Sequence, residues 1–189
     1  MRLLLHCCCG PCTVQCVESL GEEAIRPDLF WFNPNIHPYT EYKNRRDTLS
    51  QYAAAQNLAL NIIDEYGLRS FIQGVCSGPE AVGGDSPGRC AWCYRARLEK
   101  TAALAAERGY DAFCTTLLIS PWQDHEGIRR AALEAAERGG VNFLYRDFRP
   151  RFRAGQAQAR VLGLYMQKYC GCIFSEEERY LKKREPLRA

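Results

Sequence analysis

Long apolar runs are what this 189-residue sequence most clearly lacks. Its first six residues, MRLLLH, hold only three consecutive apolar side chains before a run of cysteines, far short of the apolar core of a secretory signal peptide. Nowhere does an apolar stretch approach the roughly 18 residues that a membrane-spanning helix needs. The sequence therefore predicts a cytoplasmic protein with no membrane partner.

The sequence also has little net charge and no internal repeat. Its formal charge is only +3, too small by itself to indicate a nucleic-acid partner. The basic residues are unevenly distributed, however, and gather in one stretch and again near the carboxyl end: Arg146, Arg149, Arg151, Arg153 and Arg160, then Lys182, Lys183, Arg184 and Arg188. Such runs are either solvated surface or a nucleic-acid interface. The length and the hydrophobic fraction of 47% predict one globular domain over residues 1–189.

Cysteine, in contrast, is abundant. The 11 cysteines gather at positions 7–9 and 12, at 90 and 93, and at 170 and 172, with Cys16, Cys76 and Cys114 alone. The odd number argues against a fully paired disulfide framework, and a cytoplasmic environment keeps ordinary thiols reduced. The clusters therefore indicate soft-metal ligands, redox-active thiols, or both.

Alternating apolar runs and helical patterns indicate the fold class. Strands are predicted at residues 3–6, 28–33, 60–64, 112–116 and 141–145, with helices at 14–20, 39–56, 94–108 and 124–138. Ser175 and Glu178 form a capping-box pattern that opens a last short helix, whereas residues 67–88 resemble a long mobile loop. This order predicts a three-layer α/β domain with a mainly parallel, Rossmann-like or nucleotide-hydrolase-like sheet and a C-terminal helical segment.

The unusual segments all follow predicted strands. The cysteine run follows the first strand, residues 33–38 (NPNIHP) follow the second, and residues 115–121 (TTLLISP) follow the fourth. Ligands of open α/β sheets bind outside the carboxyl ends of the strands. We therefore expect a binding crevice at that edge of the sheet.

Two cysteine pairs are candidate metal ligands. Cys8 and Cys9 are adjacent, and Cys90 and Cys93 form a CxxC pair that is expected to begin a helix. Four thiolates from two distant segments can hold a [4Fe–4S] cluster or a structural zinc ion, or can remain unliganded reactive thiols. Cys9 and Cys12 form a further CxxC at a helix start, which taken alone suggests a thioredoxin-like site.

Cys170 and Cys172 are a different kind of pair. A CxC disulfide closes a small strained ring, and strained disulfides are the labile, oxidising ones. The pair therefore suits a redox dithiol better than a structural crosslink.

Several single residues have both a structural and a functional interpretation. Packing is the favoured role of Cys16 and Cys114, because free cysteine is among the most buried residue types. His6 and His37 either make structural hydrogen bonds or act at the crevice. Asp147 either pairs with a neighbouring arginine or acts as a proton donor or metal ligand.

Taken together, the motifs resemble the QueH-type epoxyqueuosine reductases, the cobalamin-independent enzymes of queuosine biosynthesis. Residues 4–12 (LLHCCCGPC) look like the H-x-C-C-A-P-C opening of that family, and residues 32–38 (FNPNIHP), then Glu41, Tyr42 and Arg45, look like its N-P-N-I-H-P segment. Residues 89–98 (RCAWCYRARL) match R-C-x-x-C-Y-x-x-R-L, and residues 115–121, 145–149 and 165–175 (YMQKYCGCIFS) complete the set. Gly10 stands where alanine is expected, and Cys7 adds a third consecutive thiol.

The resemblance implies a [4Fe–4S] cluster on Cys8, Cys9, Cys90 and Cys93, with Cys170 and Cys172 as a redox-active pair. It implies reduction of epoxyqueuosine to queuosine in tRNA, and so a tRNA partner and an electron donor. Some members of the family hold an additional mononuclear iron whose carboxylate ligand falls near the position of Cys12, which makes Cys12 a further candidate metal ligand.

Removal of an epoxide oxygen as water takes two electrons and two protons, whereas a cubane cluster passes one electron at a time. We expect the cluster to deliver electrons, the dithiol to act as a reservoir, and Asp147, His37 or a tyrosine to provide protons. Bases of an anticodon loop can stack on aromatic side chains, and the candidates are Tyr39, Tyr42, Trp92, Trp122 and Tyr145.

Two other classes of function are compatible with the residues alone. A zinc-stabilised RNA-binding module would hold zinc and have no turnover. A general thiol–disulfide oxidoreductase would reduce model disulfides through Cys9 and Cys12 without a metal.

Overall fold

A computed structural model of the protein describes residues 1–76 and 86–181. The basic residues at 182–184 and 188 lie outside these ranges. Strands β1 (Leu3–His6), β2 (Asp28–Trp31), β3 (Leu60–Ile62), β4 (Ala112–Thr115) and β5 (Asn142–Phe143) form one sheet in the order β3-β2-β1-β4-β5. Every neighbouring pair is parallel. The predicted α/β class with a parallel sheet is confirmed.

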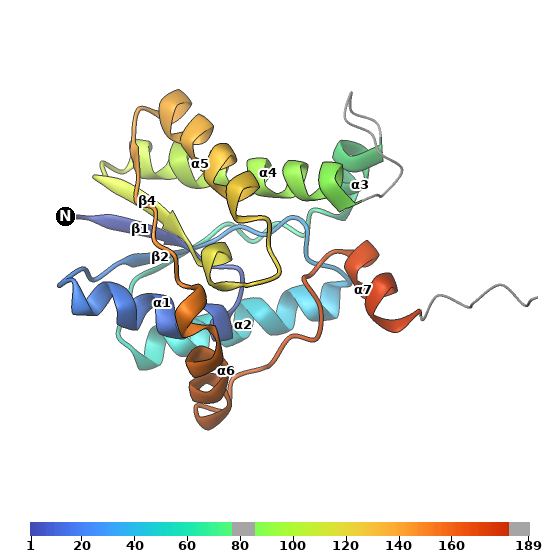
Figure 1. Ribbon diagram of the computed structural model, residues 1–189, viewed down its shortest axis with the longest axis horizontal. Helices are drawn as coiled ribbons and strands as arrows, with labels where there is room; N and C mark the ends of the chain where they lie inside the picture. The colour runs from blue at the N-terminus through green and yellow to red at the C-terminus, as the bar shows by residue number, and fades with distance from the viewer. Residues whose placement is uncertain (77–85, 182–189) are drawn as a thin grey trace, which may run out of the picture.

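Helices cover both faces of the sheet (Figure 1). Helices α4 (Ser86–Glu107) and α5 (His125–Gly139) lie side by side on one face. Helix α1 (Gly10–Glu22) lies on the other, between α2 (Tyr39–Ala55) and α6 (Phe152–Val161). Helices α3 (Leu68–Cys76) and α7 (Ile173–Tyr180) and the short 3₁₀ helices η1 (Thr116–Ile119) and η2 (Arg149–Arg151) complete the described elements. None of the helices in the described ranges is both long and apolar enough to cross a membrane.

The central strand β1 is apolar because both of its faces are covered. Leu3, Leu4 and Leu5 are fully buried, together with Phe30 on β2 and Phe113 on β4. A strand buried on both faces has no need of polar alternation, which is why a continuous apolar run marks β1 in the sequence. This core fixes the strand ends that carry the cysteine run.

Helix boundaries follow local chemistry. Asp124 caps α5 by accepting a hydrogen bond from the backbone N–H of Gly127 at 3.0 Å, and Gly140 ends that helix in the left-handed conformation at φ +63°. Gly109 follows α4 at φ +67°. Both glycines lie where the sequence predicts a helix end.

The structure corrects two parts of the predicted organisation. Residues 67–88 are not one long loop, because α3 occupies Leu68–Cys76 and α4 begins at Ser86. Helix α4 therefore contains both Cys90 and Cys93 in its opening turns. Helix α6 was not predicted, and α7 begins at Ile173, with Cys172 rather than Ser175 as its capping residue.

Candidate metal centre and active-site cavity

A cavity of about 880 Å³ opens at the carboxyl ends of the central strands. Its size lies toward the upper end of the range for small-molecule and cofactor sites. Six cysteines line it, from segments far apart in the chain: Cys8, Cys12, Cys90, Cys93, Cys170 and Cys172. Cys9 is buried next to Cys8. The structure thus brings together all the cysteines that the sequence nominates as metal ligands or redox thiols.

The cavity lies at the switch point of the sheet, where β1 neighbours β4. The chain leaves β1 into the cysteine run and leaves β4 into Thr116. The backbone N–H of Cys8 donates to Thr116 Oγ1 at 3.1 Å, and the Thr116 hydroxyl lies 3.4 Å from Cys8 Sγ. Asn33, after β2, donates through Nδ2 to the carbonyl of Cys7 at 2.9 Å. The predicted convergence of these three loops is confirmed.

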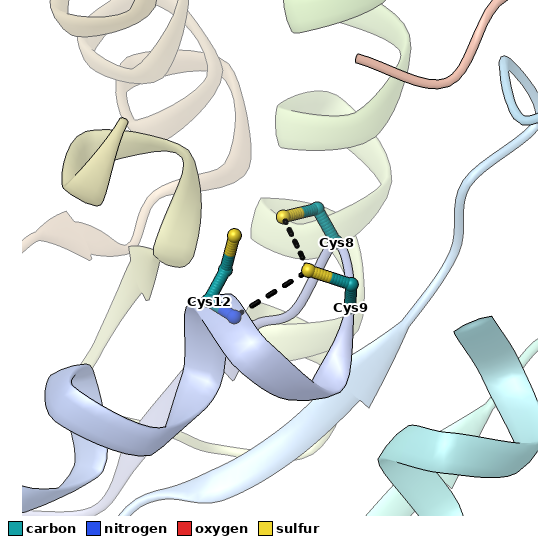
Figure 2. A group of neighbouring side chains, drawn as sticks. All are labelled: Cys8, Cys9 and Cys12. Atoms are coloured by element: carbon teal, nitrogen blue, oxygen red, sulfur yellow. Dashed lines mark hydrogen bonds between the residues drawn. The ribbon is translucent and has the colours of Figure 1, made fainter. Parts of the chain in front are cut away.

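Cys8, Cys9 and Cys12 form a compact group of thiols. Figure 2 shows their sulfur atoms turned toward one another, and all three lie within 4.8 Å of each other. Cys9 caps α1, since its Sγ accepts a hydrogen bond from the backbone N–H of Cys12 at 3.4 Å, and Pro11 occupies the first helical turn. The Sγ atoms of Cys8 and Cys9 are 3.8 Å apart.

This spacing has a direct chemical meaning. A tetrahedral ion with metal–sulfur bonds of about 2.3 Å holds its sulfurs about 3.8 Å apart. The group therefore has the dimensions of a site for one thiophilic ion. Gln167 adds a polar contact, because its Nε2 donates to Cys9 Sγ at 3.0 Å and lies 3.4 Å from Cys12 Sγ.

The group also favours one thiolate. Hydrogen bonds from Cys12 and Cys9 hold the pKa of Cys8 well below its usual range. Burial raises the pKa of Cys9, and the hydrogen bond to Cys8 raises that of Cys12. Cys8 is therefore the member of the group that is most readily deprotonated for metal binding.

Cys93 lies beside a buried arginine. Arg97, one helical turn further along α4, donates from Nη2 to Cys93 Sγ at 2.9 Å and from Nε to the Cys93 carbonyl at 2.9 Å. The side chain of Arg97 is only 2% exposed. Burial works against its charge, but Cys93, Cys170 and Cys8 raise its pKa above the ordinary value. Burial raises the pKa of Cys93, and in the described part of the chain no carboxylate pairs with Arg97, so its hydrogen-bond partners are the sulfur and the carbonyl of Cys93.

The segment that carries Cys170 and Cys172 is held by α2. Arg45 donates from Nη1 to the carbonyl of Cys170 at 2.8 Å and from Nη2 to that of Tyr169 at 2.9 Å. Its Nε donates to Glu41 Oε1 at 2.7 Å in an ion pair that is almost fully buried. Glu41 also accepts a hydrogen bond from the hydroxyl of Tyr165. We refer to Glu41, Arg45, Tyr165, Tyr169 and Cys170 together as the α2 clamp.

Gly171 and the start of α7 set the geometry of the dithiol. Gly171 has φ +146°, and a Cβ there would meet the side chains of Ile36 and Arg45 at 3.2 and 3.3 Å. Cys172 Sγ accepts from the backbone N–H of Ser175 at 3.4 Å, and Cys170 Sγ accepts from Gln123 Nε2 at 3.2 Å. Both cysteines are free thiols, with Cys170 exposed and Cys172 buried.

Other residues that the sequence nominated lie elsewhere. Asp147 is exposed, pairs with Arg149 at 2.6 Å and is not among the residues that line the cavity, so its role in proton transfer stays a prediction. His6 makes structural hydrogen bonds to Thr115 Oγ1 and to the carbonyl of Phe32. Cys16 and Cys114 are fully buried in the core, as their predicted packing role requires.

Four contributors to the site had no role assigned from the sequence: Arg45, Arg97, Gln123 and Gln167. The first two carried a signal, since Arg45 follows Glu41 and Arg97 follows Cys93 by four residues, a spacing that brings side chains together on a helix. Gln167 carried none, because 155 positions separate it from the nearer cysteine that it contacts.

Comparison with known proteins identifies relatives of the whole chain. Residues 3–178 match the family described as "Epoxyqueuosine reductase QueH". A protein of that name from Dehalococcoides mccartyi is 35% identical over 185 residues, which is 98% of each chain. Its namesake from Thermotoga maritima is 33% identical, covering 97% of this chain and 94% of that protein. A third, from Acinetobacter baylyi, is 32% identical over 92% of this chain and 80% of its own length.

Proposed function

The chain belongs to the QueH family of epoxyqueuosine reductases, and from that premise we propose that it reduces epoxyqueuosine in tRNA with an iron–sulfur cluster and a cysteine pair. The family membership makes it an enzyme of queuosine biosynthesis that acts on a tRNA substrate. The proposal concerns how its side chains perform that reaction. It assigns Cys8, Cys9, Cys90 and Cys93 to a [4Fe–4S] cluster, and Cys170 and Cys172 to the redox dithiol.

The observation that carries the proposal is the lining of the cavity. Thiols from three distant segments face one space, and the buried Arg97 donates to one of them. Four thiolates around a cluster concentrate negative charge, which compensates a buried guanidinium better than neutral thiols do. The donor set thus fits a thiolate-bound cluster, and hydrogen bonds to its sulfurs are a recognised means of tuning its potential.

Cys12 offers an alternative completion of the metal site. Cys8, Cys9 and Cys12 have the dimensions of a single-ion site, whereas the four ligands of a cluster each bind a different iron and stand further apart. The two arrangements share Cys8 and Cys9. They differ in the remaining ligands, which are Cys12 in the single-ion site and Cys90 and Cys93 on α4 in the cluster. An additional mononuclear iron would use Cys12 as a ligand.

The dithiol can balance the reaction. Conversion of an epoxide to an alkene and water consumes two electrons and two protons. Oxidation of two thiols to one disulfide releases the same number of each, so the C–O bonds break as the S–S bond forms. The backbone N–H of Ser175 at the start of α7 and the side-chain amide of Gln123 donate to the sulfurs of Cys172 and Cys170, and these hydrogen bonds position the pair. When bound on Cys8, Cys9, Cys90 and Cys93, the cluster would supply one-electron transfer; return of the disulfide to the dithiol takes two electrons from the electron donor and two protons from solvent.

The geometry disfavours a general thiol–disulfide oxidoreductase acting through Cys9 and Cys12. Cys9 is 1% and Cys12 is 7% exposed, and the pKa of each is raised. Attack on a protein disulfide needs an accessible thiolate. Neither cysteine meets that condition.

Metal analysis tests the ligand assignment. Anaerobically reconstituted protein should contain about four iron and four sulfide per chain, or about five iron if Cys12 supports an additional ion. Cys90→Ala and Cys93→Ala should lose the cluster absorbance, whereas Cys12→Ala should lose at most the fifth iron. Cys114→Ala, in the core, is the control and should keep the full content. Stoichiometric zinc without sulfide would contradict the cluster and favour a zinc-stabilised binding module.

Turnover tests the dithiol. Cys172→Ser should retain iron, sulfide and tRNA binding while losing most conversion of epoxyqueuosine to queuosine. Cys76→Ser, at an exposed thiol that does not line the cavity, is the matched control and should retain activity. Wild-type turnover by Cys172→Ser would remove the dithiol from the chemistry, and loss of iron would make Cys172 a ligand.

A further inference from the structure

The rim of the cavity differs in character from its floor. Many floor residues, including Cys93, Arg97 and Thr116, are buried. The rim consists of five lining residues that are exposed and are either cationic or aromatic: Trp122, Arg153, Arg160, Lys168 and Arg179. Among the described lining residues only Glu178 carries a carboxylate, and Arg89 pairs with it at 2.8 Å. The rim is therefore a cationic border around the cavity that contains the cysteines.

The arginine-rich stretch divides into two sets. Arg146 pairs with Glu23, Arg149 with Asp147 and Arg151 with Glu22, so these three cations are already compensated. Arg153 and Arg160, in contrast, have no carboxylate partner in the described ranges, and both border the cavity. The sequence left the whole stretch as either solvated surface or a nucleic-acid interface, and the structure restricts the uncompensated charges of the stretch to these two arginines.

Helix α6 presents these arginines on one face. Phe152, Arg153, Gln156 and Arg160 all line the cavity and follow the helical repeat. Gly155 and Ala159 are the buried positions of this helix, which packs on α1. Arg160 follows Arg153 by seven positions, which corresponds to about 10 Å along the helix axis. The two guanidinium groups can therefore contact different phosphates of one strand.

Trp122 is the remaining element of the rim. It is 79% exposed, and its ring meets that of Phe152 edge-on at a centroid distance of 4.9 Å. None of the other candidate stacking residues lines the cavity. Tyr42 is fully buried, and Trp92 packs against Phe71. Tyr39 and Tyr145 are exposed, but at other places on the surface. An open indole beside unpaired cations is the combination that binds single-stranded nucleic acid.

We infer that Trp122 and the α6 face of Arg153 and Arg160 form the surface on which the anticodon loop docks. Trp122 stacks on a base next to the modified nucleotide, and the two arginines bind flanking phosphates, so that the modified base enters the cavity. The inference rests on the proposed function, because it takes tRNA as the substrate. An acidic electron-carrier protein could use the same cations but would leave the indole without a role, and this favours RNA.

Binding of an RNA hairpin with the anticodon stem-loop sequence tests the surface. Fluorescence anisotropy would give the dissociation constant of the reconstituted protein from low to physiological salt. Arg153→Gln/Arg160→Gln should weaken binding and reduce the slope of log K against log salt by about 1.4, which is about 0.7 for each lost single-strand phosphate contact. Trp122→Ala should weaken binding about fivefold or more with an unchanged slope, and Trp122→Phe should restore most of the affinity.

Two control variants separate docking from general charge and general aromaticity. Arg149→Gln removes a cation of the same stretch that is paired with Asp147, and Tyr39→Ala removes an exposed aromatic ring that does not line the cavity. Both should bind RNA like the wild type. Wild-type affinity and slope in the double arginine variant, or an effect of Arg149→Gln as large as that of the double variant, would overturn the inference.

The outcome for the docking surface is separable from that for the proposed function. If the wild type converts epoxyqueuosine in tRNA but the rim variants bind the hairpin normally, the docking inference alone fails. If those variants bind normally but lose activity only with a protein electron donor, the rim is a protein-docking surface and the inference also fails. If the wild type with a strong chemical reductant converts no epoxyqueuosine, the proposed chemistry fails whatever the rim binds.

Discussion

The ion pair at the centre of the α2 clamp leads to a prediction of stability. Helix α2 carries two ion pairs with the same four-residue spacing, Glu41–Arg45 and Lys43–Asp47. The side chains of the first are 7% and 1% exposed, and those of the second are 54% and 40% exposed. The two pairs therefore compare a buried with an exposed interaction on one helix.

Arg45→Met should be strongly destabilising. It retains much of the apolar stem but leaves the buried Glu41 carboxylate without its cation and two backbone carbonyls without their donor. Removal of one partner of a buried ion pair costs about 3–5 kcal/mol. In a chain of this size that cost corresponds to a fall in Tm of roughly 6–20 °C. Lys43→Met, at the exposed pair, should cost no more than about 0.5 kcal/mol.

Urea denaturation of the metal-free wild type and both variants measures these differences. The double variant Glu41→Gln/Arg45→Met should recover part of the stability that Arg45→Met loses, because it no longer buries an uncompensated carboxylate. If Arg45→Met costs less than about 1 kcal/mol, or no more than Lys43→Met, the clamp does not hold the dithiol segment and the reasoning is refuted.

Three further substitutions have opposite or pH-dependent effects. Gly171→Ala should destabilise the protein by about 1–3 kcal/mol, because φ +146° is strained for alanine, whereas Gly21→Ala in α1, with open space around it, should stabilise it by up to about 1 kcal/mol. Equal effects of the two in urea denaturation would contradict this. Burial lowers the pKa of His37 from 6.5 to about 4, so folding disfavours its charged form and stability is lost as pH falls from 6.5 toward 4. His37→Gln should flatten the unfolding free energy in that pH window relative to wild type, and identical pH profiles would show that His37 is not responsible.

The parts of the fold that the sequence predicts are those fixed by short-range chemistry. The run of leucines in β1 is apolar because both faces of that strand are covered, and Gly109 and Gly140 end helices because they adopt positive φ. Each of these signals acts within a few residues. The convergence of the cysteine run with Thr116 was also predictable, because parallel strands place their carboxyl ends at one edge.

The unpredicted elements lack such signals. Helix α6 buries only Gly155 and Ala159, whose small side chains give no apolar stripe, and it depends on close packing against α1. Helix α3 is short and lies beside a Gly- and Pro-rich stretch. The sequence also treated Cys9 as a ligand or redox thiol, although its Sγ additionally caps α1. Capping by a thiol is not among the common signatures of a helix start.

The candidate site shows the same division between local and long-range information. The cysteine pairs were recognisable by their spacing, but the residues that control them act across the chain: Arg45 lies 125 positions from the Cys170 carbonyl that it binds. The charge of the arginine-rich stretch is a clearer case still. Sequence alone makes Arg151 and Arg153 equivalent, whereas the fold gives the first a carboxylate partner, Glu22, and brings the second to the cavity rim. Which cations remain available to a substrate is decided by tertiary pairing, so a count of basic residues overestimates the binding surface, and the paired arginines become the natural controls for the unpaired ones.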